Sequence, residues 1–87
     1  MVDYAHQLAK GVRERRRELG ISQSELARRA GMTQPGISRI ELGGTTPTLP
    51  LLSRLAGAMD SELDIHLAPE HGQVIVRFTS HGTEDAA

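Results

Sequence analysis

Four residues in one short stretch are spaced so that they gather on one side of a helix. Residues 33–42 read TQPGISRIEL, and Ile37 and Ile40 mark the side that faces a core. The residues left on the exposed side are Gln34, Pro35, Ser38 and Arg39. Arginine pairs with guanine and glutamine pairs with adenine in the major groove of DNA, so we predict that these four contact bases. A solvated polar face on an ordinary helix pair is the alternative interpretation.

Other hydrogen-bond donors flank this stretch and suit phosphate oxygens, which position a protein on DNA without reading its sequence. They are amide and hydroxyl groups from the preceding helix, from the helix cap and from the glycine- and threonine-rich loop that follows. The predicted phosphate-binding residues among them are Gln23, Thr33, Gly44, Thr45 and Thr46.

Two helices joined by a tight turn are predicted to position these groups. Ser22 is a suitable N-cap for the first helix, and Glu25 three residues later completes a capping box. Gly31 supplies the left-handed residue that ends this helix, and Thr33 caps the second one. Pro35 is tolerated in the first turn, because its missing N–H group would have no helical partner there.

The stretch SQSELARRAGMTQPGISRIELG resembles the helix-turn-helix of the phage-repressor/Cro-like (XRE) family. The resemblance extends from about Leu8 to Met59. Its matching positions are Ser22, Gln23, Leu26, Ala27, Gly31, Gln34, Ile37, Glu41, Pro47, Leu55 and Ala56. It implies a mainly α fold, in which residues 1–60 form a four-helix, lambda-repressor-like helix-turn-helix domain that binds double-stranded DNA.

In this family, the position matching Arg16 often pairs with the glutamate matching Glu41. The resemblance therefore implies a structural ion pair between Arg16 and Glu41, which ties the first helix to the end of the base-contacting helix. The first helix is predicted to begin with Asp3 as its cap. A buried pair of this kind orients more than it stabilises. With Arg16 so engaged, Arg13 becomes the phosphate-binding candidate in the basic run at residues 13–17.

After Asp60 the apolar periodicity changes from helical to alternating. Strands are predicted over residues 62–68 and 73–79 around the turn sequence PEHG, which gives a C-terminal β-hairpin or strand pair. An isolated hairpin is marginal in water and exposes two edges, so we predict that residues 61–79 form a dimerisation element. A hairpin folded back on its own helices is the alternative. The predicted homodimer interface consists of Leu63, Ile65, Leu67, Val74, Val76 and Phe78.

This layout of helices followed by strands resembles most closely the subgroup that contains the antitoxin of the Hip toxin–antitoxin pair, in which a short strand pairs across a dimer. The resemblance leaves two functions open. One is a sequence-specific DNA-binding transcriptional regulator, a repressor, that acts as a dimer on a palindromic operator. The other is an antitoxin of a type II pair, which binds a toxin protein and represses its own operon.

Length and composition fit a single small domain in a chain of 87 residues, with a flexible tail predicted at residues 80–87. The chain has no cysteine, no apolar run long enough to span a membrane and no signal peptide, so we expect a cytoplasmic protein. The net charge is −1, but residues 1–40 hold eight Lys and Arg against four acids, whereas residues 41–87 hold two against seven. A basic front and an acidic back suit docking on DNA with one face.

The sequence shows no nucleophile–base set, phosphate loop or paired-acid site, so we expect no enzymatic activity. We also expect no metal and no cofactor, because the histidines have no ligand spacing. These histidines are His6, His66, His71 and His81.

Overall fold

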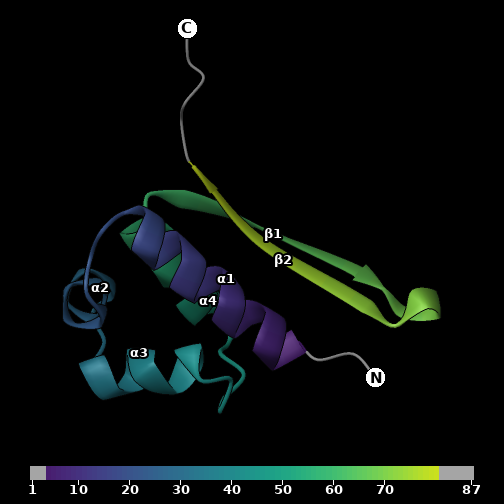
Figure 1. The fold of residues 1–87 in the computed structure, drawn as a ribbon, viewed down its shortest axis with the longest axis horizontal. Coiled ribbons are helices and arrows are strands. Elements are labelled where there is room, and N and C mark those ends of the chain that lie inside the picture. Colours follow the sequence, from purple (N-terminus) through teal and green to yellow (C-terminus); the bar gives the residue numbers. More distant parts are fainter. Residues whose placement is uncertain (1–3, 81–87) are drawn as a thin grey trace, which may run out of the picture.

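Four α-helices are followed by a two-stranded antiparallel sheet in the computed structural model, which describes residues 4–80 (Figure 1). This arrangement confirms the fold predicted from the sequence. The predicted cap at Asp3 and the predicted tail beyond Ser80 lie outside the described residues, and Ser80 itself ends the second strand. The elements are α1 (Tyr4–Glu18), α2 (Gln23–Ala30), α3 (Gln34–Glu41), α4 (Leu49–Ala58), β1 (Ser61–Ala68), a 3-10 turn (Pro69–His71) and β2 (Gln73–Ser80).

Hydroxyl side chains define where α2 and α3 begin. Ser22 Oγ accepts a hydrogen bond from the N–H group of Glu25 at 3.0 Å, and Thr33 Oγ1 accepts one from the N–H group of Gly36 at 3.2 Å. Each bond satisfies an N–H group that has no partner within its own helix. Between the two helices, Gly31 adopts the left-handed conformation with a φ of 68° and ends α2. The caps and this glycine together fix the turn of the helix pair.

The hydrophobic core lies where the four helices meet, and the hairpin adds to it from one side. Every helix contributes fully buried side chains, which include Leu8, Val12, Leu26, Ile37, Leu52 and Leu55. Phe78 of β2 joins this core with 9% of its surface exposed. Gly11 of α1 allows the approach, because a Cβ atom at this position would lie only 3.3 Å from the Phe78 ring. The open end of the hairpin is thereby packed on α1.

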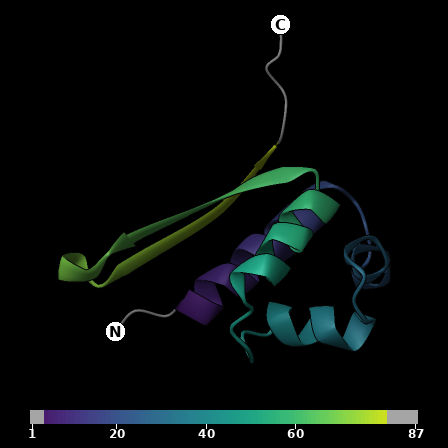
Figure 2. The same ribbon diagram turned by 180° about the vertical axis from the view of Figure 1, so that it is seen from behind.

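The strand register gathers the six predicted interface residues on one face of the hairpin, which we call the inner face. Alternate side chains of a strand lie on the same side, and the paired residues share that side. The inner face packs on α1 and α4 near the open end, whereas the tip extends beyond the helices (Figures 1 and 2). Leu67, close to the tip, remains 62% exposed. The three inner pairs are Leu63 with Phe78, Ile65 with Val76, and Leu67 with Val74.

Candidate nucleic-acid interface

Helix α3 lies on the opposite side of the molecule from the hairpin, with α1 and α4 between them (Figures 1 and 2). Gln34, Pro35 and Arg39 are exposed and Ser38 is half-buried, whereas the apolar residues of α3 face the core. Pro35 occupies the first turn of α3, where a missing N–H group costs no hydrogen bond. The structure therefore brings the four predicted base-contacting residues together on one accessible side of the helix.

A buried ion pair joins the end of α3 to α1. Arg16 Nε lies 2.6 Å from Glu41 Oε2 and Arg16 Nη2 lies 3.0 Å from Glu41 Oε1, so the guanidinium binds the carboxylate through two parallel hydrogen bonds. Arg16 Nη1 also donates to the carbonyl oxygen of Ile21 at 2.9 Å. Only 4% of the Glu41 surface is exposed. The pair lies at the two positions that the family resemblance singles out.

Opposing effects act on the pKa of Glu41. Burial raises it most, but hydrogen bonds from Arg16 and Gln23 together with the positive charges of Arg16 and Arg13 outweigh burial and hold the pKa of this carboxyl below its usual value. The hydrogen bond with Glu41 in turn raises the pKa of Arg16. Glu41 is therefore a carboxylate at neutral pH, and a carboxylate can only accept hydrogen bonds.

This acceptor sets the orientation of two glutamine side chains. Gln23 Nε2 donates to Glu41 Oε1 at 3.0 Å, and Gln34 Nε2 donates to Gln23 Oε1 at 2.8 Å. Because the carboxylate cannot donate, Gln23 must turn its NH2 group toward Glu41, and its carbonyl oxygen then accepts from Gln34. Gln34 keeps its own carbonyl oxygen and a second N–H group for another partner. One acceptor and one donor on a glutamine match the N6 and N7 groups of adenine.

Besides Gln23 and the capping hydroxyl of Thr33, two more of the predicted phosphate-binding groups have partners inside the protein. Arg13 Nη1 donates to the carbonyl oxygen of Glu41 at 2.9 Å, which places the half-buried Arg13 side chain against the end of α3. An arginine has five N–H donors, so this bond leaves others for a phosphate. The N–H group of Gly44 donates to the carbonyl oxygen of Arg39 at 3.1 Å, and that proton is not free for a phosphate. The other predicted residues are exposed or half-buried around α3: Gln23, Thr33, Thr45 and Thr46.

Two further arginines act within the fold, and reasoning from the sequence missed both. Arg15 Nε donates to Ser61 Oγ at 2.7 Å, which joins α1 to the start of β1. Arg54 Nη2 donates to the carbonyl oxygens of Ala30 at 2.7 Å and Gly31 at 2.9 Å, and so satisfies the C-terminal end of α2. No local pattern distinguishes these side chains from solvated arginines, because their partners are distant in the sequence.

The acidic side chain of Glu25 balances part of the positive charge on α2. Its carboxylate accepts hydrogen bonds from Arg28 and Arg29, and these bonds lower the pKa of Glu25 to about 2. The Glu25 side chain turns toward these arginines and away from the N–H group of Ser22. Of the two bonds in the predicted capping box, the one that forms is therefore from the N–H group of Glu25 to Ser22 Oγ. Arg39 of α3, by contrast, makes no ion pair within residues 4–80. Its guanidinium is therefore available to a partner outside the chain.

Two further observations concern residues 4–80 as a whole. These residues contain no group of three His, Cys, Asp or Glu side chains placed to hold a metal ion. None of the helices that they form is long and apolar enough to cross a bilayer.

Comparison with known proteins gives a family match and similar regulators. The helix-turn-helix family profile matches residues 12–65. An uncharacterized HTH-type transcriptional regulator from Methanothermobacter thermautotrophicus is 43% identical over 63 residues, which cover 70% of this chain and 91% of that protein. Another uncharacterized HTH-type transcriptional regulator, from Haemophilus influenzae, is 44% identical over 50 residues, which cover 58% of this chain and 51% of that protein.

A solved structure is similar as well. The crystal structure of the restriction-modification controller protein C.AhdI from Aeromonas hydrophila superposes with a TM-score of 0.63 at 25% sequence identity, over 78% of this chain and 90% of that chain. The family match includes all of α2, α3 and α4 and more than half of the chain. This protein therefore belongs to the helix-turn-helix family, and the relatives that match it are named as transcriptional regulators.

Proposed function

We propose that this protein is a sequence-specific DNA-binding repressor that acts as a dimer on a palindromic operator. The observation that carries the proposal is a series of hydrogen bonds from Arg16 through Glu41 and Gln23 to Gln34, which runs from the core to the exposed side of α3. A free surface glutamine loses rotamer entropy when it binds. Here, three helices already hold Gln34 with a defined donor and acceptor, and this preorganisation suits a residue that reads a base.

In this proposal α3 enters the major groove and lays its exposed side along the base edges. Gln34 contacts adenine, and Arg39 contacts guanine with its guanidinium. Pro35 and Ser38 add apolar and hydroxyl contacts beside them. Phosphates on either side of the groove hold the protein in register. The residues that bind them are Arg13, Gln23, Thr33, Thr45 and Thr46.

The hairpin, residues 61–79, links two subunits in the same proposal. Its inner face extends past its own helices and leaves Leu67 largely exposed (Figure 1). A second subunit would bury this side chain. One α3 binds a half-site only modestly, and the link raises affinity through effective concentration. Two-fold symmetry then requires half-sites about one helical turn apart. The structurally similar C.AhdI is named a controller protein, which supports a regulatory role.

Selection of bound sequences from a random DNA pool tests the proposal. We expect enrichment of a palindrome with half-sites separated by about one helical turn. Fluorescence anisotropy on the selected and the scrambled sequence should then show that both affinities fall with salt while the preference for the selected sequence persists. Equal affinity for the two sequences, or no enriched sequence, would refute sequence-specific binding.

A second candidate is an antitoxin that binds a toxin protein and also regulates its own operon. The observation in its favour is the outer face of the hairpin, where Ile75 is 42% exposed beside Asp64, His66 and Arg77. In this candidate function, Ile75 and the polar side chains around it form the contact surface for the toxin. Co-expression with the product of each adjacent gene tests this candidate. A stable complex that Ile75→Glu disrupts supports it, and the absence of any complex removes it.

A further inference from the structure

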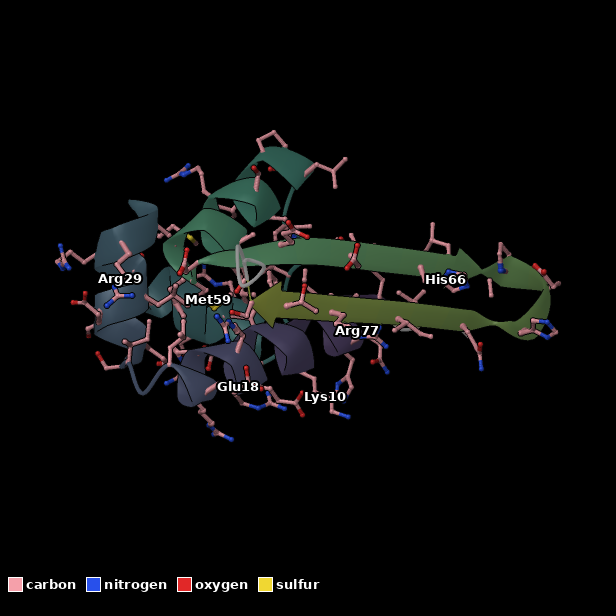
Figure 3. All side chains as sticks on the ribbon, turned by 90° about the horizontal axis from the view of Figure 1, so that it is seen from above. Lys10, Glu18, Arg29, Met59, His66 and Arg77 are labelled. Atoms are coloured by element: carbon pink, nitrogen blue, oxygen red, sulfur yellow. The ribbon has the colours of Figure 1, made fainter. Side chains whose placement is uncertain are left out.

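The two open edges of the hairpin border grooves of opposite character. Beside β1, a groove of about 730 Å3 separates the strand from α4, and its apolar lining includes Leu49, Leu52, Ala56, Gly57 and Leu63. Beside β2, the groove next to α1 is lined by charged side chains, namely Lys10, Glu14, Arg15, Glu18 and Arg77. Figure 3, which looks down on the hairpin, shows α4 emerging beyond β1, and Lys10 and Glu18 beyond β2. The edges are therefore suited to different partners.

We infer that β1 pairs antiparallel with β1 of a second copy of this chain, with Ile65 on the two-fold axis and Leu67 of each copy in the α4 groove of the other. The inference rests on the proposed dimeric regulator, and it names the edge, the register and the groove that form the interface. An edge strand presents unpaired N–H and C=O groups, which an identical strand can satisfy. The result is a four-stranded sheet with the order β2, β1, β1, β2.

Pairing around Ile65 matches apolar side chains on the inner face. It places Leu63 beside Leu67 of the second copy and extends each apolar row through four strands. Leu67 then lies over the groove that Leu49 and Leu63 line in the other copy. Leu49 is 70% exposed and Leu67 is 62% exposed in one subunit, so each covers the other. Gly57 leaves room for this contact, since no heavy atom lies within 4 Å of a Cβ built there.

On the outer face, the same register places Asp64 opposite His66 of the second copy, whose imidazole can donate a hydrogen bond to the carboxylate. An axis at Asp64 would place two copies of Asp64 opposite each other, and an axis at Leu63 would place Asp64 opposite Glu62. Like charges directly opposite each other destabilise a sheet. An axis at His66 would place Leu63, in the interior of the strand, opposite Pro69, which lies in the turn and cannot donate to the ladder. The axis at Ile65 avoids the two like-charge pairs and places Pro69 opposite only Ser61, the first residue of β1.

Pairing through β2 offers no comparable fit. The inner side chains of a second β2 would lie over Lys10, Glu14 and Glu18, and removing such charges from water is costly. Contact between β1 of one copy and β2 of the next would be heterologous, and a contact that does not close gives filaments.

Pairing between edges also suits a single DNA duplex. The two-fold axis is then perpendicular to the sheet, and α3 lies on the far side of the helices from the sheet (Figures 1 and 2). Both α3 helices therefore face the same way. Packing the inner or outer faces of two hairpins together would instead direct the two α3 helices to opposite sides.

Cysteine cross-linking tests the register, because the chain has no cysteine of its own. Asp64→Cys protein is mixed with His66→Cys protein, left to exchange subunits and treated with a short bifunctional thiol reagent. We expect efficient links between copies, since opposite residues of antiparallel strands lie about 4.5–5.5 Å apart. The matched pair is Ile75→Cys with Arg77→Cys, which would be opposite in a β2–β2 dimer and should stay unlinked. Efficient linking of this second pair, or of neither pair, would overturn the inference.

Sedimentation of two glutamate variants tests the groove contact. Leu67→Glu changes a side chain that is largely exposed in a single copy, so each subunit should still fold. The dissociation constant of the dimer should rise by at least about a hundredfold, because two leucines per dimer lose their burial. Ile75→Glu on the outer face is the matched control and should leave the dimer intact. Equal dissociation constants for the two variants would contradict the groove contact.

These measurements need no DNA, so they separate the inference from the proposed function. A protein that binds its selected operator as a dimer, yet fails to cross-link through positions 64 and 66, overturns the inference and leaves the proposed function standing. A protein that cross-links there but binds no preferred DNA sequence supports the interface and removes the proposed function.

Discussion

Removing the guanidinium of Arg16 should destabilise the protein strongly at neutral pH. In the variant Arg16→Met, the methionine fills part of the space but leaves the buried Glu41 carboxylate without its two hydrogen bonds from Arg16. Breaking a buried pair by removing one partner costs about 3–5 kcal/mol. Gln23 still donates to Glu41, and 13% of the Arg16 side chain is exposed, so we expect the lower end, about 3 kcal/mol. In a domain of this size such a loss lowers the Tm by about 12–24 °C.

The pH dependence distinguishes this mechanism from a general loss of packing. In the native protein the pKa of Glu41 is held below the usual 4.5, so its pairing stabilises the fold above that pH, and the stabilisation is lost as the pH falls through the folded-state value. In Arg16→Met, burial acts without the arginine and raises the pKa of Glu41, so protonation relieves the stranded charge. The difference in stability between the two proteins should therefore shrink as the pH falls from above 4.5, where Glu41 of the variant begins to bind a proton, through the lower folded-state pKa of the native protein.

Unfolding by heat or urea, followed by circular dichroism at about pH 7 and about pH 4, measures both effects. The control is the double variant Arg16→Met, Glu41→Leu, which removes both charges and should be more stable than Arg16→Met alone. An Arg16→Met protein that melts with the native protein at neutral pH would refute the reasoning. So would a loss of stability that is equal at the two pH values.

Gln34→Ala and Arg39→Ala should each weaken binding to the selected operator by roughly 1–3 kcal/mol and hardly change binding to random DNA. If anisotropy titrations show that a variant loses as much affinity for random DNA as for the operator, these side chains do not read bases. Arg13→Ala should weaken binding to every sequence alike and lower the salt-dependence slope by about one unit, and an unchanged slope would restrict Arg13 to its contact with Glu41. Ile65→Asp should sediment as a monomer and bind the operator weakly, because an unpaired charge would be buried in the sheet, and a surviving dimer would move the interface to the helices.

The helices and strands could be predicted from the sequence because each carries its own boundary residues. Ser22 and Thr33 cap their helices through short-range hydrogen bonds, and Gly31 ends α2 through a local conformation that favours glycine. The inner face of the hairpin followed from alternation alone, since residues of a strand that share a face are two apart. These signals involve residues that are only a few positions apart, so the sequence of one protein is enough to identify them.

The destinations of long polar side chains could not be predicted in the same way. Arg15 and Arg54 reach acceptors on elements that are remote in the sequence, and nothing near either residue identifies those acceptors. The position of Arg16 against Glu41 was available only through resemblance to a family. Gln23 was predicted to bind phosphate, and the structure shows in addition that it links Glu41 to Gln34. That role depends on three helices meeting, which no local pattern encodes.

The internal use of basic side chains explains how a chain with a net charge of −1 could bind DNA with high specificity. Acceptors within the fold or on α2 engage most arginines of the basic half: Arg13, Arg15, Arg16, Arg28 and Arg29. Arginines that are engaged by acceptors in the protein contribute less to the sequence-independent attraction for phosphates. Specificity is the ratio of cognate to non-specific affinity, so weak general attraction increases the weight of each base contact. Under the proposed function that weight falls on Arg39, which makes no ion pair within residues 4–80, and on Gln34, whose orientation depends on a buried arginine.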